Sequence, residues 1–311
     1  MDHETAAERP PAAARSLRAA AVCGIALAVV FALAGCSGPR QRAGSDGRDG
    51  PAGAAASVDA LPPEAFTADF VLIGEVHDNA TAHRIRLGWI EALTAKRRMA
   101  VALEQFDAAR QPQLDAASRT PAGARDLPER ARALAEAAGF DFRGWDWAFY
   151  APVVELALRR DLPLVAANLS RRDAARVARG ETPAALEPPG WGPAQRAALS
   201  EAIRDGHCGM LPESMIEPMA AAQRTRDAQL ADSLLAAHRR SGLPVLLLAG
   251  NGHVRRDIGV PSYLAQRAPA ARVVSIGLPE SDEEPAPAFD RFVRVPVAPR
   301  EDPCAELRAR R

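Results

Sequence analysis

Short apolar runs recur along the chain, and each is bounded by glycine, proline or charged residues. Such runs are typical of strands that are buried on both faces of a parallel sheet. We therefore predict five core strands, at residues 69–73, 99–103, 164–167, 245–249 and 272–277. Residues 279–288 are acidic and rich in proline, which indicates a surface loop. Residues 292–297 alternate apolar and polar side chains, and we expect them to form a last edge strand.

Helical patterns fill the gaps between these runs. In residues 82–96, Ile85, Trp89 and Leu93 recur four residues apart and would share one helix face. The other predicted helices are residues 125–138, 152–160 (opened by Pro152), 173–178, 193–205 and 217–239. Strands that alternate with helices predict an α/β fold, here a three-layer α/β/α core with a mainly parallel sheet. The connection between the third and fourth strands is too long for a simple crossover, so we expect an inserted helical subdomain at about residues 170–240 that can cover the site.

Polar side chains follow directly after four of the predicted strands. Glu75 and His77 follow the first strand, Glu104 the second, Asn168 the third and His253 the fourth. The carboxyl ends of parallel strands meet at one edge of a sheet, where the ligands of open α/β sheets bind. We therefore predict that these five residues, called the strand-end cluster below, converge on one ligand-binding crevice. Taken singly, each has a plainer interpretation as a loop residue that makes only local hydrogen bonds.

The strand-end cluster is compatible with three kinds of chemistry. Two histidines and two carboxylates could bind a divalent metal, activate water as general base and acid, or hydrogen-bond the carboxylates of a ligand. The sequence contains no G-x-S-x-G elbow, no His-Glu-x-x-His pair, no Walker A loop and no dinucleotide fingerprint. The common hydrolase and nucleotide-binding classes therefore lack their signatures, and the residues alone leave the three alternatives open.

An aromatic segment lies between the second and third predicted strands. Six of the chain's 15 aromatic residues fall within residues 140–152. They could simply close the hydrophobic core. Alternatively, they could form a wall for a large flat ligand, with Trp147 against it and Tyr150 as an oxygen ligand to ferric haem iron, because haem iron accepts tyrosinate. The sequence offers Tyr263 as the second tyrosine.

The first 36 residues predict export and lipid attachment. Three arginines precede an apolar stretch at residues 19–34, which is too short to span a membrane comfortably. The stretch ends in Leu33-Ala34-Gly35-Cys36, typical of a bacterial lipobox, in which the cysteine becomes the lipidated first residue of the mature protein. We predict a signal peptide at residues 1–35, a flexible tether at 36–63 and a folded domain at 64–311. An ordinary secretory signal or membrane anchor with a chance cysteine is the alternative.

The cysteines and the net charge bear on the redox compartment and on the kind of partner. Once Cys23 is cleaved away and Cys36 carries lipid, Cys208 and Cys304 remain, and an oxidising compartment favours a disulfide between them over two unrelated thiols. That disulfide would exclude a metal pair formed by His207 and Cys208. The chain has 39 basic and 39 acidic residues and a formal net charge of zero, which gives no support for a nucleic-acid partner.

The order and spacing of several motifs resemble those of the ChaN-like haem-binding lipoprotein family. This family is part of a wider group with erythromycin-esterase-like enzymes and TraB/Tiki metalloprotease-like proteins. The resemblance covers about residues 66–278. It rests on Ile73-Gly74-Glu75-Val76-His77-Asp78-Asn79, on Leu103-Glu104-Gln105-Phe106, on Gly250-Asn251-Gly252-His253-Val254-Arg255, and on residues 145–152, 207–209, 223–227 and 257–261.

The resemblance implies a three-layer α/β core with a helical addition. It also implies haem or iron acquisition at the cell surface and a homodimer around haem. In the family a tyrosine binds haem iron, for which Tyr150 is our candidate here and Tyr263 the alternative. The family's Glu/His residues correspond to Glu75, His77, Glu104 and His253.

We therefore expect a lipid-anchored (palmitate-carrying) protein of the bacterial cell envelope that binds haem and takes part in iron uptake. If the cell is Gram-negative, Ser37 after the lipobox, instead of aspartate, favours the outer membrane, facing the periplasm or the cell surface. The haem propionates would be held by His77, His253 or Arg255, the arginine through charge-assisted hydrogen bonds.

Two other functions stay open at this point. One is a hydrolase, esterase or metalloprotease-like, with or without a divalent metal. In it His77 would act as general base, Glu75 or Glu104 would orient it, and His253 would stabilise developing charge. The other is a surface scaffold in which the crevice is vestigial.

Overall fold

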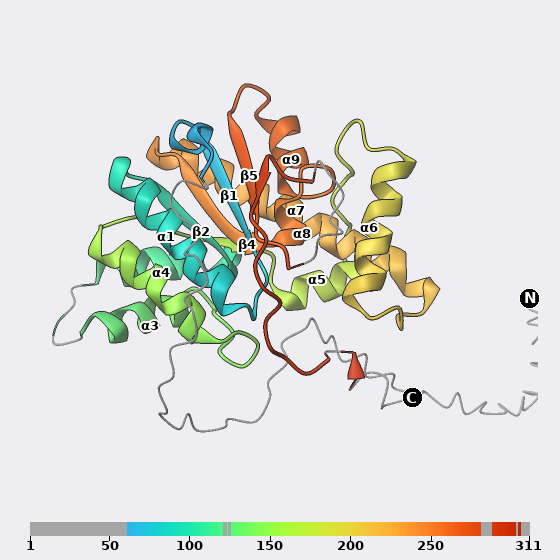
Figure 1. Ribbon diagram of the computed structural model, residues 1–311, viewed down its shortest axis with the longest axis horizontal. Coiled ribbons are helices and arrows are strands. Elements are labelled where there is room, and N and C mark those ends of the chain that lie inside the picture. Colours follow the sequence, from blue (N-terminus) through green and yellow to red (C-terminus); the bar gives the residue numbers. More distant parts are fainter. Residues whose placement is uncertain (1–60, 121–122, 124–125, 281–287, 303, 306–311) are drawn as a thin grey trace, which may run out of the picture. The chain divides into compact units, whose positions relative to one another are not determined.

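The sheet that the apolar runs predict is present, and it is parallel throughout (Figure 1). The computed structural model describes residues 61–120, 123, 126–280, 288–302 and 304–305, which fall within one compact unit, Ala34–Arg311. Six strands lie in the order β3-β2-β4-β1-β5-β6, and every neighbouring pair is parallel. The strands are β1 Phe70–Glu75, β2 Ala100–Asp107, β3 Leu164–Asn168, β4 Val245–Gly250, β5 Val273–Gly277 and β6 Arg291–Phe292.

The five core strands lie where the apolar runs place them, but the edge strand is much shorter than expected. Only Arg291–Phe292 pairs as a strand, beside the end of β5, so the prediction of a strand at 292–297 was wrong. Beyond β6, two further backbone hydrogen bonds join the chain to the end of β5 and the residues after it. They run from the Val293 N–H to the Gly277 carbonyl and from the Val295 N–H to the Pro279 carbonyl. Pro296 has no N–H to continue the ladder, and β5 has already ended at Gly277.

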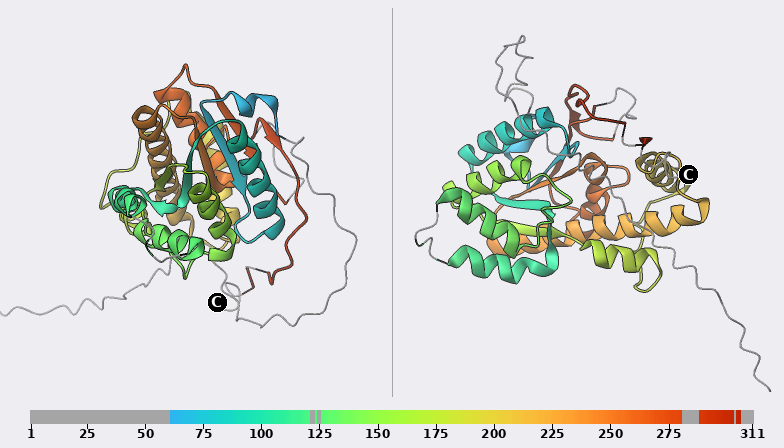
Figure 2. Two further views of the ribbon diagram at one scale, coloured as in Figure 1. Left: turned by 90° about the vertical axis from the view of Figure 1, so that its left-hand side faces the viewer. Right: turned by 90° about the horizontal axis from the view of Figure 1, so that it is seen from below.

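Helices cover both faces of the sheet, as the α/β/α prediction requires (Figure 2). Alternate strand residues point to opposite faces, so Val71 and Ile73 pack with α1, α3 and α4, while Phe70 and Leu72 pack with α7 and α9. The helices are α1 Ala80–Lys96, α2 Gln111–Arg119, α3 Leu127–Ala137, α4 Trp147–Arg159, α5 Arg171–Ala178, α6 Pro193–Gly206, α7 Glu213–Ser241, α8 Asn251–Val254 and α9 Val260–Arg267. Within the described residues, no helix is apolar and long enough to cross a membrane.

One helix start differs from the prediction. Helix α4 begins at Trp147 and contains Pro152 in its interior, so Pro152 does not open it. The side chain of Asp146 accepts a hydrogen bond from the Ala148 N–H at 3.0 Å, which caps the helix five residues earlier than the proline suggests. Much of the aromatic segment is therefore helical.

The long connection between β3 and β4 holds α5, α6 and α7. Helix α7 packs on strands β2, β3 and β4 and so forms part of one covering layer, while α6 packs on α7 (Figure 1). The function of this insertion as a cover for the site stays a prediction.

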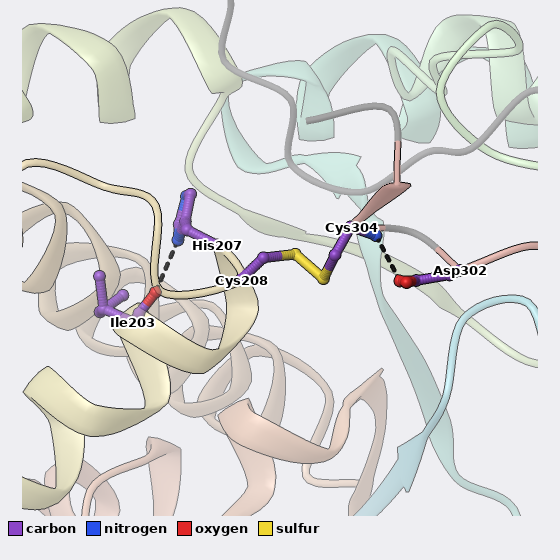
Figure 3. Close-up of a disulfide and its surroundings, with 5 residues drawn as sticks. All are labelled: Ile203, His207, Cys208, Asp302 and Cys304. Atoms are coloured by element: carbon purple, nitrogen blue, oxygen red, sulfur yellow. Dashed lines mark hydrogen bonds between the residues drawn. A yellow bond between two sulfur atoms is a disulfide. The ribbon is translucent and has the colours of Figure 1, made fainter. Parts of the chain in front are cut away.

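The segment after β6 returns past the β1–α1 loop and ends at the turn between α6 and α7. Arg300 forms ion pairs with Asp78 at 2.7 Å and with Glu280 at 2.5 Å. Beyond it, Cys304 is joined to Cys208 by a disulfide with Cα atoms 5.7 Å apart (Figure 3). The C-terminal segment is thereby fastened at Arg300 and at Cys304.

Candidate functional site

The ends of β1 and β4 lie side by side, which brings the two Gly-to-His segments together. Glu75 is in register with Gly250 in the parallel ladder. A side chain at Gly250 would place its Cβ 2.7 Å from Nε2 of His77, closer than atoms can approach. The imidazole of His77 therefore rests directly against the Gly250 backbone, and only glycine leaves room for it.

Glu75 is buried and surrounded by donors. Its Oε1 accepts hydrogen bonds from the Tyr150 hydroxyl at 2.7 Å and from Nδ1 of His77 at 3.0 Å. Its Oε2 lies 2.8 Å from Nε of Arg86. Burial raises the pKa of this carboxyl, but the charge of Arg86 and the hydrogen bond from His77 outweigh burial and hold the pKa well below its usual range. Glu75 is therefore a buried carboxylate at neutral pH.

His83 belongs to this site, although the sequence pattern did not single it out. Its Nε2 donates to the His77 carbonyl at 2.8 Å, while its Nδ1 accepts from Nε of Arg86 at 2.9 Å. One nitrogen donates and one accepts, as only a neutral imidazole can. Burial lowers the pKa of His83 to about 4, which agrees with that tautomer. A sequence signal was available, because His83 and Arg86 share the buried face of α1 with Trp89, where polar groups need partners.

Glu104, His253 and Asp227 form the second half of the site. Oε2 of Glu104 accepts from the Gly250 N–H at 2.8 Å, and its Oε1 lies 3.3 Å from Nε2 of His253. Nδ1 of His253 lies 2.6 Å from Oδ1 of Asp227. Both ring nitrogens therefore donate to carboxylates, which describes an imidazolium. Asp227 comes from α7 and lies in one of the motifs that carry the family resemblance, but its contact with His253 was not foreseen.

The pKa values of this half follow from burial and charge. Burial disfavours the imidazolium, but Glu104 and Asp227 outweigh it and raise the pKa of His253 to about 10. Burial also raises the pKa of Glu104, but His253 reverses this and lowers it to about 2. Burial raises the pKa of Asp227 to about 6 despite the same histidine. At neutral pH one cation is thus held between two carboxylates.

His77 lies between the two halves and is the histidine that reaches solvent. Of its side chain, 32% is exposed, compared with 9% for His253. Burial opposes its protonation, but the hydrogen bond to Glu75 and the charges of Glu104 and Glu75 raise its pKa. The edge of its ring packs against Trp145, with the ring centroids 4.7 Å apart. A ligand that contacts this cluster can therefore reach His77 from solvent.

The two residues of the aromatic segment that were predicted to contact haem, Tyr150 and Trp147, differ in burial. Tyr150 is fully buried, and its hydroxyl donates to Glu75. Burial raises its pKa well above the usual value, so the phenol is protonated. Its role as an iron ligand stays a prediction, and it would require this hydrogen bond to break. Trp147 is half-buried and packs edge-on against Phe140 and Phe142.

The other residues predicted for the site are Arg255, Asn168, Tyr263 and Cys36. The guanidinium of Arg255 donates two hydrogen bonds, of 3.0 and 2.7 Å, to the carboxylate of Asp257. A haem propionate would have to compete with that carboxylate for the guanidinium. Asn168 is buried at the end of β3, and its Oδ1 has no hydrogen-bond partner among the described residues. Tyr263 is fully buried in α9. Cys36 lies outside the described residues.

A divalent metal finds no ligand set in the part of the chain that the structure describes. No group of three or more His, Cys, Asp or Glu side chains there is arranged to hold one. His207, beside the disulfide, instead bonds through Nδ1 to the Ile203 carbonyl at 2.7 Å (Figure 3). The strand-end cluster is thus suited to proton transfer and hydrogen bonding, with a half-buried aromatic surface next to His77.

Comparison with known proteins identifies one matching family and several solved structures with a similar fold. Residues 63–264 match the family described as haem-binding uptake, Tiki superfamily, ChaN. Among solved structures, a ChaN of Campylobacter jejuni, described for cofacial haem binding, is similar with a TM-score of 0.62 and 25% identity over 73% of this chain and 87% of that one. The erythromycin esterase EreC (TM-score 0.41, 16% identity, 74% and 76% covered) and a Bacillus cereus protein (0.38, 12%, 72% and 69%) are more distant. No curated protein sequence matches this chain.

Proposed function

Because the chain belongs to the ChaN family of haem-binding uptake proteins in the Tiki superfamily, we propose that it is a lipid-anchored protein that binds haem and takes part in haem and iron uptake. The observation that carries the proposal is the surface around His77. The solvent-accessible imidazole lies against Trp145, and Trp147 and Phe149 are half-buried nearby on α4. A flat apolar ligand with a polar centre suits such a surface.

The candidate haem contacts can be ranked by their access to solvent. His77 comes first, because its Nδ1 is engaged by Glu75 and its ring is partly exposed. Tyr150 and His253 are buried behind it and would act through their bonds to Glu75 and Glu104. Haem, when bound, supplies an iron centre with an open coordination position. The protein would supply the apolar surround and the hydrogen bonds.

Titration of the purified full chain with hemin tests this proposal. We expect a Soret band that saturates at a defined stoichiometry, and His77→Ala should weaken or shift it by more than Tyr150→Phe does. The control is His207→Ala, a histidine that bonds locally outside the cluster. The absence of any Soret change at stoichiometric hemin would overturn haem binding.

The anchor and the assembly are part of the same proposal. Cys36 is the cysteine of a lipobox, so cells fed labelled palmitate should incorporate the label into the wild-type chain and not into Cys36→Ser. The similar C. jejuni protein is described for cofacial haem binding, and we propose that two copies of this chain assemble around haem. Sedimentation with and without hemin should then show a haem-dependent dimer, and an unchanged mass would contradict that assembly.

A hydrolase is the second candidate, because Glu75 and His77 form an oriented pair. Glu75 fixes the proton on Nδ1 of His77 at 3.0 Å and leaves Nε2 as the possible base. A screen of ester and peptide substrates, with and without divalent metal, would detect turnover. His77→Ala should abolish it, while turnover unaffected by His77→Ala together with His253→Ala would reject this cluster as the catalytic site.

A further inference from the structure

One buried arginine near the strand-end cluster lacks a partner. Three arginines of the described residues are buried: Arg86, Arg224 and Arg226. Arg86 pairs with Glu75 at 2.8 Å, and Arg224 pairs with Glu217 at 2.7 Å. Arg226, on α7, is only 8% exposed, and in the described part of the chain its guanidinium makes no hydrogen bond and no ion pair. An uncompensated buried cation is unfavourable unless something else offsets it.

The nearest carboxylates are already engaged elsewhere. Arg226 interacts electrostatically with Glu104 and Asp227, but both of these carboxylates are bonded to His253. Glu104 also accepts the Gly250 N–H. Burial lowers the pKa of Arg226, and the positive charge of Arg171 at the start of α5 acts in the same direction. Neither carboxylate forms a hydrogen bond or an ion pair with the guanidinium in the described part of the chain.

A charge count around Arg226 favours an additional anion. Glu104 and Asp227 contribute two negative charges, and His253 and Arg226 contribute two positive ones. His77 adds a third positive charge when it is protonated, because Glu75 is already matched by Arg86. With His77 protonated, the cluster thus carries one surplus positive charge, and the Arg226 guanidinium can receive the matching anion.

Other buried polar groups at the carboxyl edge of the sheet also lack partners. Within the described residues, neither side-chain polar atom of Gln105, next to Glu104, has a hydrogen-bond partner, and neither does Oδ1 of Asn168. These residues lie at the carboxyl ends of the adjacent strands β2 and β3. Buried polar groups are usually hydrogen-bonded, so both residues can accept further bonds from a ligand at this edge.

We propose that Arg226 is the anchor of an anion-binding subsite that receives a carboxylate or phosphate group of the ligand. The planar guanidinium fork matches the two oxygens of either group. The anion has two possible sources. It could belong to a free small molecule, or it could be a propionate of haem, in which case the subsite rests on the proposed haem function. The body of the ligand would then extend toward His77.

Calorimetric titration of the full chain with inorganic phosphate and with propionate, at constant ionic strength, tests the subsite. We expect saturable binding of one equivalent to the wild type and a loss of roughly tenfold or more in affinity for Arg226→Gln. The matched control is Arg176→Gln, an exposed arginine on α5 that pairs with Asp173 and Glu181. It should bind as the wild type does. No saturable binding of either anion to the wild type, or equal binding by Arg226→Gln, would overturn the proposal.

Stability of Arg226→Met separates a binding role from a structural one. Removal of an unpaired buried charge should leave the anion-free protein as stable as the wild type, or more stable. If Arg226→Met unfolds, the guanidinium is needed by the fold and the proposal fails.

Hemin and hemin dimethyl ester, which lacks free carboxylates, distinguish the two sources of the anion. Weaker binding of the ester to the wild type, with no such difference in Arg226→Gln, would assign the anion to a propionate. Phosphate binding without any hemin binding would keep the subsite and overturn only the haem function.

Discussion

At the scale of single residues, a glycine and three buried carboxylates decide how the histidines are used. Gly250 leaves space for the ring of His77, whose Nδ1 is fixed by Glu75. His253 is held between Glu104 and Asp227 and is committed as a cation. Two histidines that look equivalent in sequence therefore differ in exposure and in their hydrogen-bond partners.

Gly250→Ala should displace His77. The new Cβ would lie 2.7 Å from Nε2, so the ring must move away from its place beside Glu104. We expect a loss of about 1–3 kcal/mol in the free energy of unfolding and a weaker Soret response to hemin. Chemical denaturation and hemin titration measure the two effects. Gly206→Ala is the control, because a Cβ there meets nothing within 4 Å, and an equal loss in that variant would contradict the explanation.

The charges of His253 and Glu104 predict that the free energy of unfolding falls on both the alkaline and the acid side of neutral pH. The folded pKa of His253, about 10, lies above its ordinary 6.5, so its contribution is complete below about pH 6.5 and is lost as pH rises toward 10. The folded pKa of Glu104, about 2, lies below its ordinary 4.5, so its contribution is present above pH 4.5 and is lost as pH falls toward 2.

Denaturant unfolding from pH 3 to pH 10 measures this profile. His253→Gln should lower stability by about 3 kcal/mol near neutral pH, because it leaves carboxylates without their cation. It should also flatten the alkaline flank. His207→Gln, outside the cluster, should keep the wild-type shape. A wild-type profile that does not fall between pH 7 and pH 10 would rule out the His253 cation.

At the scale of elements, the starts of helices determine what the site contains. Asn79 caps α1 through its side chain, at 2.9 Å from the Ala82 N–H, and so orients His83 and Arg86 toward Glu75. Asp146 caps α4 in the same way and turns Tyr150 inward.

Loss of the α4 cap should therefore affect both stability and binding. Asp146→Ala should reduce the free energy of unfolding by about 1 kcal/mol and loosen the turn that carries Trp147 and Tyr150. Hemin affinity should fall, as followed by the Soret band. Asp126→Ala removes the equivalent cap of α3, at 2.9 Å from the Glu129 N–H, so it should have a similar effect on stability and none on binding. Equal binding losses in both variants would point to general destabilisation.

The sequence predicted the strands well and the helix-borne parts of the site poorly. Apolar runs mark buried strands, and strand ends of a parallel sheet share one edge, so Glu75, His77, Glu104 and His253 could be grouped from the order of residues alone. The position of Asp227 depends on how α7 packs on the sheet, and single-sequence periodicity does not contain that information. The burial of Tyr150 was not foreseen for the same reason, since α4 begins at the Asp146 cap and not at Pro152.

At the scale of the whole described unit, the C-terminal segment links parts that are distant in sequence. Arg300 joins it to the β1–α1 loop, and the disulfide, with a sequence separation of 96 residues, joins it to the α6–α7 turn. These two connections lie four residues apart in sequence and hold the segment against the β1–α1 loop and the α6–α7 turn.

Replacement of both Cys208 and Cys304 by serine should release the end of this segment. Local opening would expose the bond after Arg300, so trypsin should cut there well before it cuts the core. Mass spectrometry of timed digests measures the rate. Reductant should accelerate cleavage of the wild type and leave the double variant unchanged. Equal rates in the two proteins would show that Arg300 alone holds the segment.

The neighbouring positions of β1 and β4 have a consequence for biogenesis. The hydrogen bond from Gly250 to Glu104 connects residues 146 apart in sequence, and the bond from Tyr150 to Glu75 connects residues 75 apart. Contacts of such high contact order form slowly and late. A chain that is still emerging from the ribosome has β1 and β2 but not β4, and so lacks half of the site. The ligand site would thus be complete only after β4 and the histidine that follows it have been synthesised.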